Sequence, residues 1–174
     1  QGAFSGCIAL EQVTVSEGVE EIGYGAFDKC AAIQELVLPS TISVIGEAAF
    51  RGCWALKSLE IPFGITVIEP YTFSDSGVKQ LTIPDSVTEI KYNAFADCQG
   101  LTEIVIPDSV TKLGGGCFED CYQLTKVHLS ENLSKIPGGL FKNCMRLGQV
   151  NIPDGVTSIG SWAFYNCSSL TSVV

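Results

Sequence analysis

The sequence predicts an α/β repeat solenoid, a right-handed superhelix with a parallel sheet on one face and short helical or 3₁₀ segments on the other. Three columns of residues at a fixed period support this prediction. A phenylalanine recurs every 22 or 23 residues, at Phe4, Phe27, Phe50, Phe73, Phe95, Phe118, Phe141 and Phe164. A cysteine or serine follows each phenylalanine by three residues, and an aliphatic residue follows after three more. A unit of this length cannot bury its apolar side alone, so neighbouring units must stack.

The first predicted element of each unit is a short strand. Three and five residues after each aliphatic residue come apolar positions that alternate with polar ones, as in LKSLEIP at residues 56–62. This period of two is typical of a half-buried strand, and stacked units would place such strands ~4.8 Å apart in a parallel sheet. Turn residues such as Asp85-Ser86 and Asp108-Ser109 then end the strand and begin an extended return segment.

The last predicted element of each unit is a short helix. The A-F-x-x-C-x-x-L segment has apolar residues three apart, which predicts one or two turns of short or 3₁₀ helix. One unit departs from the period, because a single residue, Gly77, separates Ser76 from Val78 where the other units have two. The same unit has Ser76 in place of the column cysteine.

Composition and charge limit the class of protein. The 174 residues are 46% hydrophobic and carry 10 basic against 19 acidic side chains, a net charge of −9. This composition excludes intrinsic disorder. The acidic balance argues against nucleic acid as a partner, which would require clustered Lys and Arg. Apolar runs are short and interrupted, so we expect no membrane insertion.

We expect residues 1–174 to form a single array of about seven 23-residue repeats. The chain begins and ends inside the repeat pattern, so we also expect it to be a fragment of a longer protein. Exposed end rungs would present unpaired strand edges to another chain. End-to-end self-association of the isolated array is therefore an expectation as well.

The eight cysteines are interpreted as a core column. Seven follow a column phenylalanine by three residues, while Cys117 occupies the slot directly before Phe118. Free, buried and unreactive thiols are the interpretation that burial statistics favour. Zinc would require paired ligands a few residues apart, a spacing that only the C-x-x-x-C pair of Cys117 and Cys121 approaches. Oxidised pairs remain open, because stacked rungs bring column cysteines near the distance that disulfides require.

The sequence contains no recognisable catalytic set. The only histidine is His128, in a strand position expected to face outward, and no nucleophile motif, phosphate loop or metal-binding motif accompanies it. We therefore expect a protein that is not an enzyme, with no catalytic residue, no cofactor and no metal.

Candidate binding residues lie on the outward strand positions, which change chemistry from rung to rung. In a solenoid these positions form an extended surface that can face a ligand. The candidates on this sheet face are Glu35, Glu60, Thr82, Glu103, Lys126, His128 and Asn151. Trp54 and Trp162 are further candidates, because exposed aromatic residues are enriched at interaction hot spots. A solvated sheet face and local aromatic packing are the alternative interpretations.

The repeat resembles the leucine-rich repeats of the BspA-like family, found in surface proteins of oral and gut bacteria and in some parasitic protists. Blocks such as LTIPDSVTEIKYNAFADCQGL at residues 81–101 carry the resemblance, together with the L-x-x-L-x-L skeleton of Leu56, Leu59 and Ile61. The asparagine ladder usual in other leucine-rich repeats is replaced by Pro and the A-F-x-x-C block. The resemblance covers essentially the whole chain and implies a leucine-rich-repeat fold.

The resemblance also implies a function. It suggests an extracellular or cell-surface binding or adhesion module, secreted or surface-attached, that recognises a protein or glycan on a host or neighbouring cell through its sheet face. The alternative is a structural spacer or stalk that carries another domain of the same surface protein. The resemblance identifies neither the ligand nor any catalytic residue.

Overall fold

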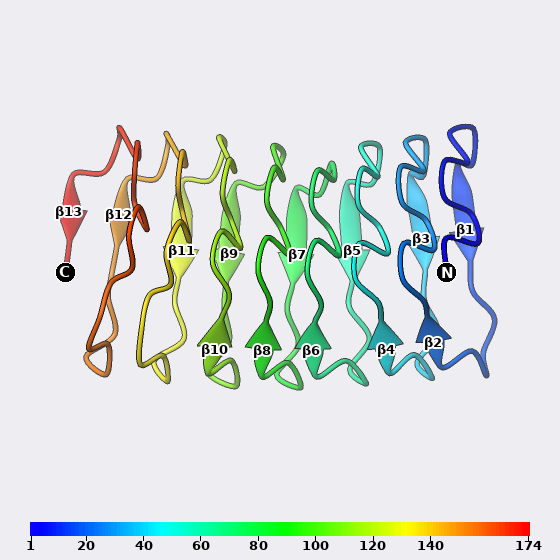
Figure 1. The fold of residues 1–174 in the computed structure, drawn as a ribbon, viewed down its shortest axis with the longest axis horizontal. Coiled ribbons are helices and arrows are strands. Elements are labelled where there is room, and N and C mark those ends of the chain that lie inside the picture. The colour runs from blue at the N-terminus through cyan, green and yellow to red at the C-terminus, as the bar shows by residue number, and fades with distance from the viewer.

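The computed structural model describes all 174 residues as a single row of stacked rungs (Figure 1). The N-terminus lies at one end of the row and the C-terminus at the other. Strands of successive rungs pair in parallel with an offset of one repeat, so Gln12 lies opposite Glu35 and Lys126 opposite Glu103. The predicted solenoid with parallel sheets is therefore confirmed.

The predicted strands form one side of the solenoid. They are β1 (Gln12–Thr14), β3 (Glu35–Val37), β5 (Ser58–Glu60), β7 (Gln80–Thr82), β9 (Glu103–Val105), β11 (Lys126–His128), β12 (Gln149–Val150) and β13 (Ser172–Val173). Hydrogen bonds group them into the pairs β1–β3 and β5–β7 and the four-stranded sheet β9–β11–β12–β13. In the three-residue strands the central residue points inward and its two neighbours are exposed, as in Ser58–Leu59–Glu60, so the predicted alternation is confirmed.

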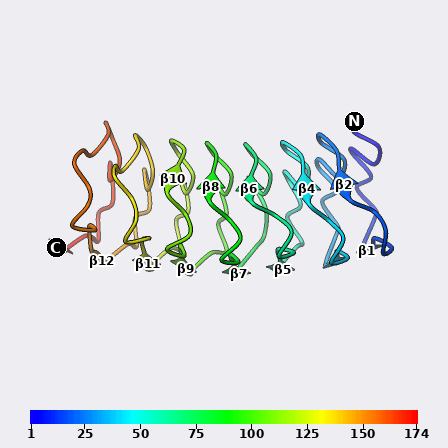
Figure 2. The same cartoon turned by 90° about the horizontal axis from the view of Figure 1, so that it is seen from below.

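The return segments form a second row of strands, visible on another side of the solenoid in Figure 2. These strands are β2 (Glu21–Ile22), β4 (Val44–Ile45), β6 (Val67–Ile68), β8 (Glu89–Ile90) and β10 (Lys112–Leu113). They also pair in parallel, with Ile22 opposite Ile45. Further along, Ile136 and Ile159 continue this row as a single bridge. The extended return of each unit is thus itself a short strand.

The predicted helical face is wrong, because the chain contains no helix. The A-F-x-x-C segments are chains of consecutive tight turns whose backbone amides alternate between two kinds of partner. Ala26 N–H donates to Gly23 O within its own rung at 3.2 Å, whereas Phe27 N–H donates to Ala49 O of the next rung at 2.8 Å. A helix would direct every amide along its own axis, so these segments exchange helical bonds for bonds between rungs.

Two columns of left-handed residues enforce this alternation. The positions two before and two after each column phenylalanine all have positive φ, for example Gly25 at 58° and Lys29 at 59° on either side of Phe27. A right-handed helix cannot pass through a residue in this conformation. Glycine, asparagine and aspartate tolerate it best, and they fill most of both columns. The exceptions are Lys29, Ala48, Tyr71 and Trp162, with φ values of 54° to 61°.

The column phenylalanines form a continuous stack through the turn side of the core. Neighbouring rings from Phe4 to Phe164 lie nearly parallel, with centroids 5.1–5.8 Å apart. The five rings from Phe50 to Phe141 are almost fully buried. Inward-facing aliphatic residues of both strand rows, such as Ile90 and Ile104, complete one continuous core.

The column cysteines join neighbouring rungs through their thiols. Each buried column thiol lies within hydrogen-bonding distance of the carbonyl oxygen of the phenylalanine one rung earlier, as for Cys144 Sγ and Phe118 O at 3.1 Å. All eight cysteines are free, and seven are buried, whereas Cys7 is exposed. Burial raises the pKa of the thiols, to about 11 for Cys98 and about 12 for Cys53 and Cys117. The buried thiols therefore stay protonated, and the prediction of burial fails only at Cys7.

Candidate binding surface

The sheet face presents every predicted candidate residue to solvent. Glu35 lies on β3, Glu60 on β5 and Thr82 on β7, while Glu103 lies on β9, Lys126 and His128 on β11, and Asn151 directly after β12; all seven are exposed. Their positions follow from the strand period of two, because the alternate residues point into the core. The structure brings them together in two groups along the face.

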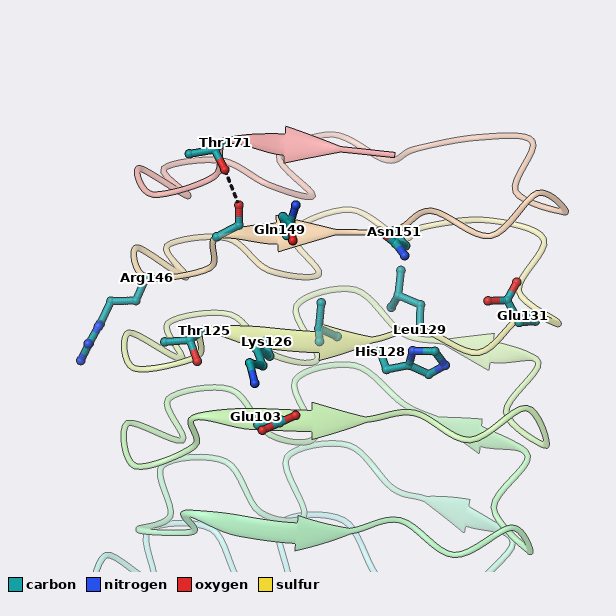
Figure 3. A pocket seen from close by; sticks show the side chains of 12 residues that line it. Glu103, Thr125, Lys126, His128, Leu129, Glu131, Arg146, Gln149, Asn151 and Thr171 are labelled. Carbon is teal, nitrogen blue, oxygen red and sulfur yellow. Dashed lines mark hydrogen bonds between the residues drawn. The ribbon is translucent and has the colours of Figure 1, made fainter.

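The first group surrounds an open depression of about 650 Å³ over β9, β11 and β12 (Figure 3). Of the predicted residues, Glu103, Lys126, His128 and Asn151 line it. Glu103 and Lys126 are register partners on adjacent strands, and Figure 3 shows their side chains next to each other on the face. The lining is mostly polar, with Val127 and Leu129 as its apolar members.

The basic groups of this depression have no acidic partner within ion-pair distance. The three ion pairs of the chain lie elsewhere and join Arg51 to Asp28, Lys91 to Glu69 and Lys142 to Glu119. Residues 122–174 carry four basic and two acidic side chains, a net charge of +2 in a chain whose total is −9. Glu103 and Glu131 also line the depression, so its charges are mixed, with two carboxylates beside Lys126 and Arg146.

Arg146 belongs to this depression and escaped the sequence analysis. It lines the rim, and its guanidinium donates a hydrogen bond to Gln123 Oε1 of the preceding rung. Arg146 occupies a column that holds small residues such as Ala32, Ala55 and Gly100 in earlier rungs. That change from small to basic was the available signal, but the column lies before the strand and was not treated as part of the sheet face.

The second group lies on the N-terminal half of the face. Glu35, Glu60 and Thr82 line a depression of about 470 Å³ over β3, β5 and β7. This depression contains two carboxylates and no basic side chain. The N-terminal depression thus has only carboxylates as charged groups, whereas the C-terminal one carries both signs, so the candidate residues do not form one uniform site.

The two tryptophans do not join the sheet-face groups. The Trp54 side chain is 60% exposed and lies beside a separate notch with Asp75 and Asp97. Trp162 is 69% exposed in the last turn segment, and Lys142 Nζ lies 5.9 Å from the centre of its ring. Neither residue lines either sheet-face depression.

Other kinds of site find little support in the arrangement of side chains. No three His, Cys, Asp or Glu side chains converge in a way that could hold a metal ion. The chain has no helix of the length and apolarity needed to cross a membrane. His128 stands on the open sheet face without a nucleophile beside it among the lining residues.

The stacked parallel strands, the inward leucines and isoleucines and the exposed sheet face define a leucine-rich repeat protein. The model of the BspA type leucine rich repeat region, in six copies, matches residues 1–102 and 88–174. This chain therefore belongs to the BspA-type leucine-rich repeat family. No curated protein matches it.

Solved structures of bacterial leucine-rich repeat proteins share the fold. A protein from Bacteroides ovatus is 31% identical with a TM-score of 0.88, and the match covers 94% of this chain and 45% of that protein. The T. pallidum leucine rich repeat protein is 29% identical with a TM-score of 0.82, over 92% of this chain and 77% of that one.

A third relative is described as a cell surface protein. A leucine rich cell surface protein from Faecalibacterium prausnitzii is 26% identical with a TM-score of 0.59, and the match covers 98% of this chain and 55% of that protein. This chain spans less than half the length of the Bacteroides ovatus protein.

Proposed function

We propose that this array is an extracellular or cell-surface binding module that recognises a protein or glycan through its sheet face. The observation that carries the proposal is the depression over β9, β11 and β12, where Lys126 and Arg146 are exposed and form no ion pair, with Glu103 and Glu131 also in the lining. Carboxylate or sulfate groups of a partner can pair with Lys126 and Arg146, which have no ion pair within the chain. The cell-surface location rests on membership of the family and on the relative described as a cell surface protein.

Within each rung the backbone and the outward side chains have separate roles, and this supports recognition over a purely structural role. Backbone pairing holds the strands together, so the outward side chains are not needed for stacking and are free to vary. They do vary, from Glu60 through Thr82 and Val105 to His128. Opposite charges across an interface contribute to partner choice and to the rate of association, and unpaired charges on an exposed face are available for this purpose.

Surface-plasmon binding of the array to a panel of extracellular-matrix proteins, plasma proteins and acidic glycans tests the proposal. We expect saturable binding to a panel member at physiological salt and weaker binding as salt rises. The double variant Lys126→Glu/Arg146→Glu should lower the affinity by at least about tenfold, because repulsion replaces attraction at the depression.

The matched control is Lys112→Glu/Lys135→Glu, which makes the same change in net charge at two exposed lysines, one in β10 and one directly before the Ile136 bridge. It should leave binding within about twofold of the unchanged array. Equal losses in both double variants would mean that total charge, and not the sheet face, determines binding. If a folded, monomeric sample binds no member of the panel, the result would instead favour the structural spacer.

A further inference from the structure

The shortened repeat leaves a notch in the edge of the solenoid. The position directly after the column cysteine is exposed in the neighbouring rungs, where Trp54 and Gln99 occupy it. The rung between them lacks one residue and has only Gly77 between Ser76 and Val78. Trp54 and Gln99 therefore face each other across a gap of about 300 Å³ that Asp75 and Asp97 also line.

The floor of this notch cannot be filled from within the chain. A side chain at Gly77 would place its Cβ 1.9 Å from the Trp54 carbonyl oxygen, well inside van der Waals contact. At Gly100 a Cβ would lie 2.9 Å from the Gly77 carbonyl oxygen. Both glycines line the notch, and the close approach of neighbouring backbones keeps them without side chains.

The carboxylates of the notch are where a side-chain ladder stops. In the column two residues after each phenylalanine, Asn166 donates its amide to Asn143 Oδ1 at 3.1 Å, and Asn143 donates to Asp120 Oδ1 at 2.7 Å. Asp97 and Asp75 follow in the same column, and carboxylates have no N–H to donate. Neither one forms an ion pair in the chain. Burial, followed by repulsion from Asp120 and Asp75, raises the pKa of Asp97.

We propose that this notch binds an organic cation, in the form of an arginine side chain of a partner protein. A guanidinium stacks on aromatic faces and presents N–H donors in the fork that carboxylates accept. Trp54 supplies the exposed aromatic residue, and Asp75 and Asp97 supply carboxylate acceptors that form no ion pair within the chain. The inference goes beyond the sheet-face proposal, because none of these residues lines the sheet-face depressions, and each can fail without the other.

The probe is the capped tripeptide acetyl-Gly-Arg-Gly-amide, whose only charge is the guanidinium, added to the intact array. The reporter is the indole N–H resonance of Trp54 in two-dimensional NMR spectra, with the resonance of Trp162 as an internal control. We expect a saturable shift of Trp54 with a dissociation constant in the millimolar range, as befits a single side chain. The neutral citrulline analogue should bind at least about tenfold more weakly, as followed by the Trp54 resonance, because it lacks the positive charge.

Variants assign the binding to the notch. Asp75→Asn/Asp97→Asn should weaken the affinity for the tripeptide by about five- to tenfold. Glu11→Gln/Asp154→Asn, which removes the same charge at exposed positions, should leave this affinity unchanged. The proposal is overturned by the absence of a saturable Trp54 shift up to about 50 mM peptide, or by an equal response to the citrulline analogue. A stronger response to a neutral methyl glycoside would also overturn it and would make the notch a sugar site.

Discussion

The turn side and the sheet face of this solenoid use the same repeat in opposite ways. On the turn side, side chains add contacts between rungs to the backbone bonds, through phenylalanine rings stacked 5.1–5.8 Å apart and thiols directed at phenylalanine carbonyls. On the sheet face the backbone makes those contacts, and the outward side chains touch solvent. A buried column repeats its residue where the side chain packs between neighbouring rungs, whereas exposed columns vary, even where two of their members pair across rungs as Arg51 and Asp28 do.

The largest expected effect comes from the phenylalanine stack. Phe118→Ala removes a fully buried ring that stacks on Phe95 and Phe141, so we expect a loss of about 3–5 kcal/mol of unfolding free energy in urea titrations. Phe63→Ala makes the same chemical change at a side chain that is 74% exposed and should cost less than about 0.5 kcal/mol. Similar losses in the two variants would mean that the buried stack adds nothing to the contacts between rungs.

The thiol column should show a smaller effect with a chemical signature. Cys121 Sγ lies 3.3 Å from Phe95 O, and the thiol is fully buried. Cys121→Ala removes the donor and should cost about 1–2 kcal/mol, measured by thermal or urea unfolding. Cys121→Ser should cost less, because a hydroxyl can still donate, and the chain already buries Ser76 in this column. If serine is the worse replacement, the column is held by apolar packing alone.

The left-handed columns predict a substitution that stabilises. Lys29 is exposed with a φ of 59°, in a column where Gly6 and Gly52 occupy the adjacent rungs. A left-handed conformation costs a residue with a Cβ about 1–2 kcal/mol, and glycine avoids this at an entropic cost of about 0.4–1 kcal/mol. Lys29→Gly should therefore raise the unfolding free energy by about 0.5 kcal/mol. Lys57→Gly, at an exposed lysine outside these columns, should lower it.

The same contrast explains which parts of the structure could be predicted from the sequence. The rungs, the strands and the outward residues follow from the period and the alternation, which are local signals. The helical interpretation of the turn segments failed because apolar residues three apart fit a 3₁₀ helix and consecutive turns equally well. The glycines at Gly2, Gly25 and Gly116 were the missed signal, since they mark a left-handed position. The place of Arg146 at the depression and the notch at Gly77 could not be predicted. They depend on which side chains lie beside each other in neighbouring rungs and on whether the gap left by the missing residue is filled.

The smallest expected effect tests the column of carboxylates and is specific to pH. Because the pKa of Asp97 is raised in the folded state, its ionisation opposes folding at neutral pH, and this cost disappears as pH falls through the folded pKa toward the ordinary value of 3.8. Asp97→Asn removes the cost and supplies an amide donor toward the preceding rung. We expect it to stabilise the array at pH 7 by a few tenths of a kcal/mol, as seen in urea unfolding.

The gain from Asp97→Asn should shrink progressively as the pH is lowered to about 4, because the wild-type carboxyl then becomes neutral as well. Asp154→Asn, at an exposed carboxylate outside this column, serves as the control and should show little change across the same range. A gain that persists unchanged at pH 4 would mean that the new amide bond, and not relief of repulsion from Asp75 and Asp120, stabilises the variant. In that case the carboxylates would be held apart well enough to need no external cation, and the turn side would be complete without a partner.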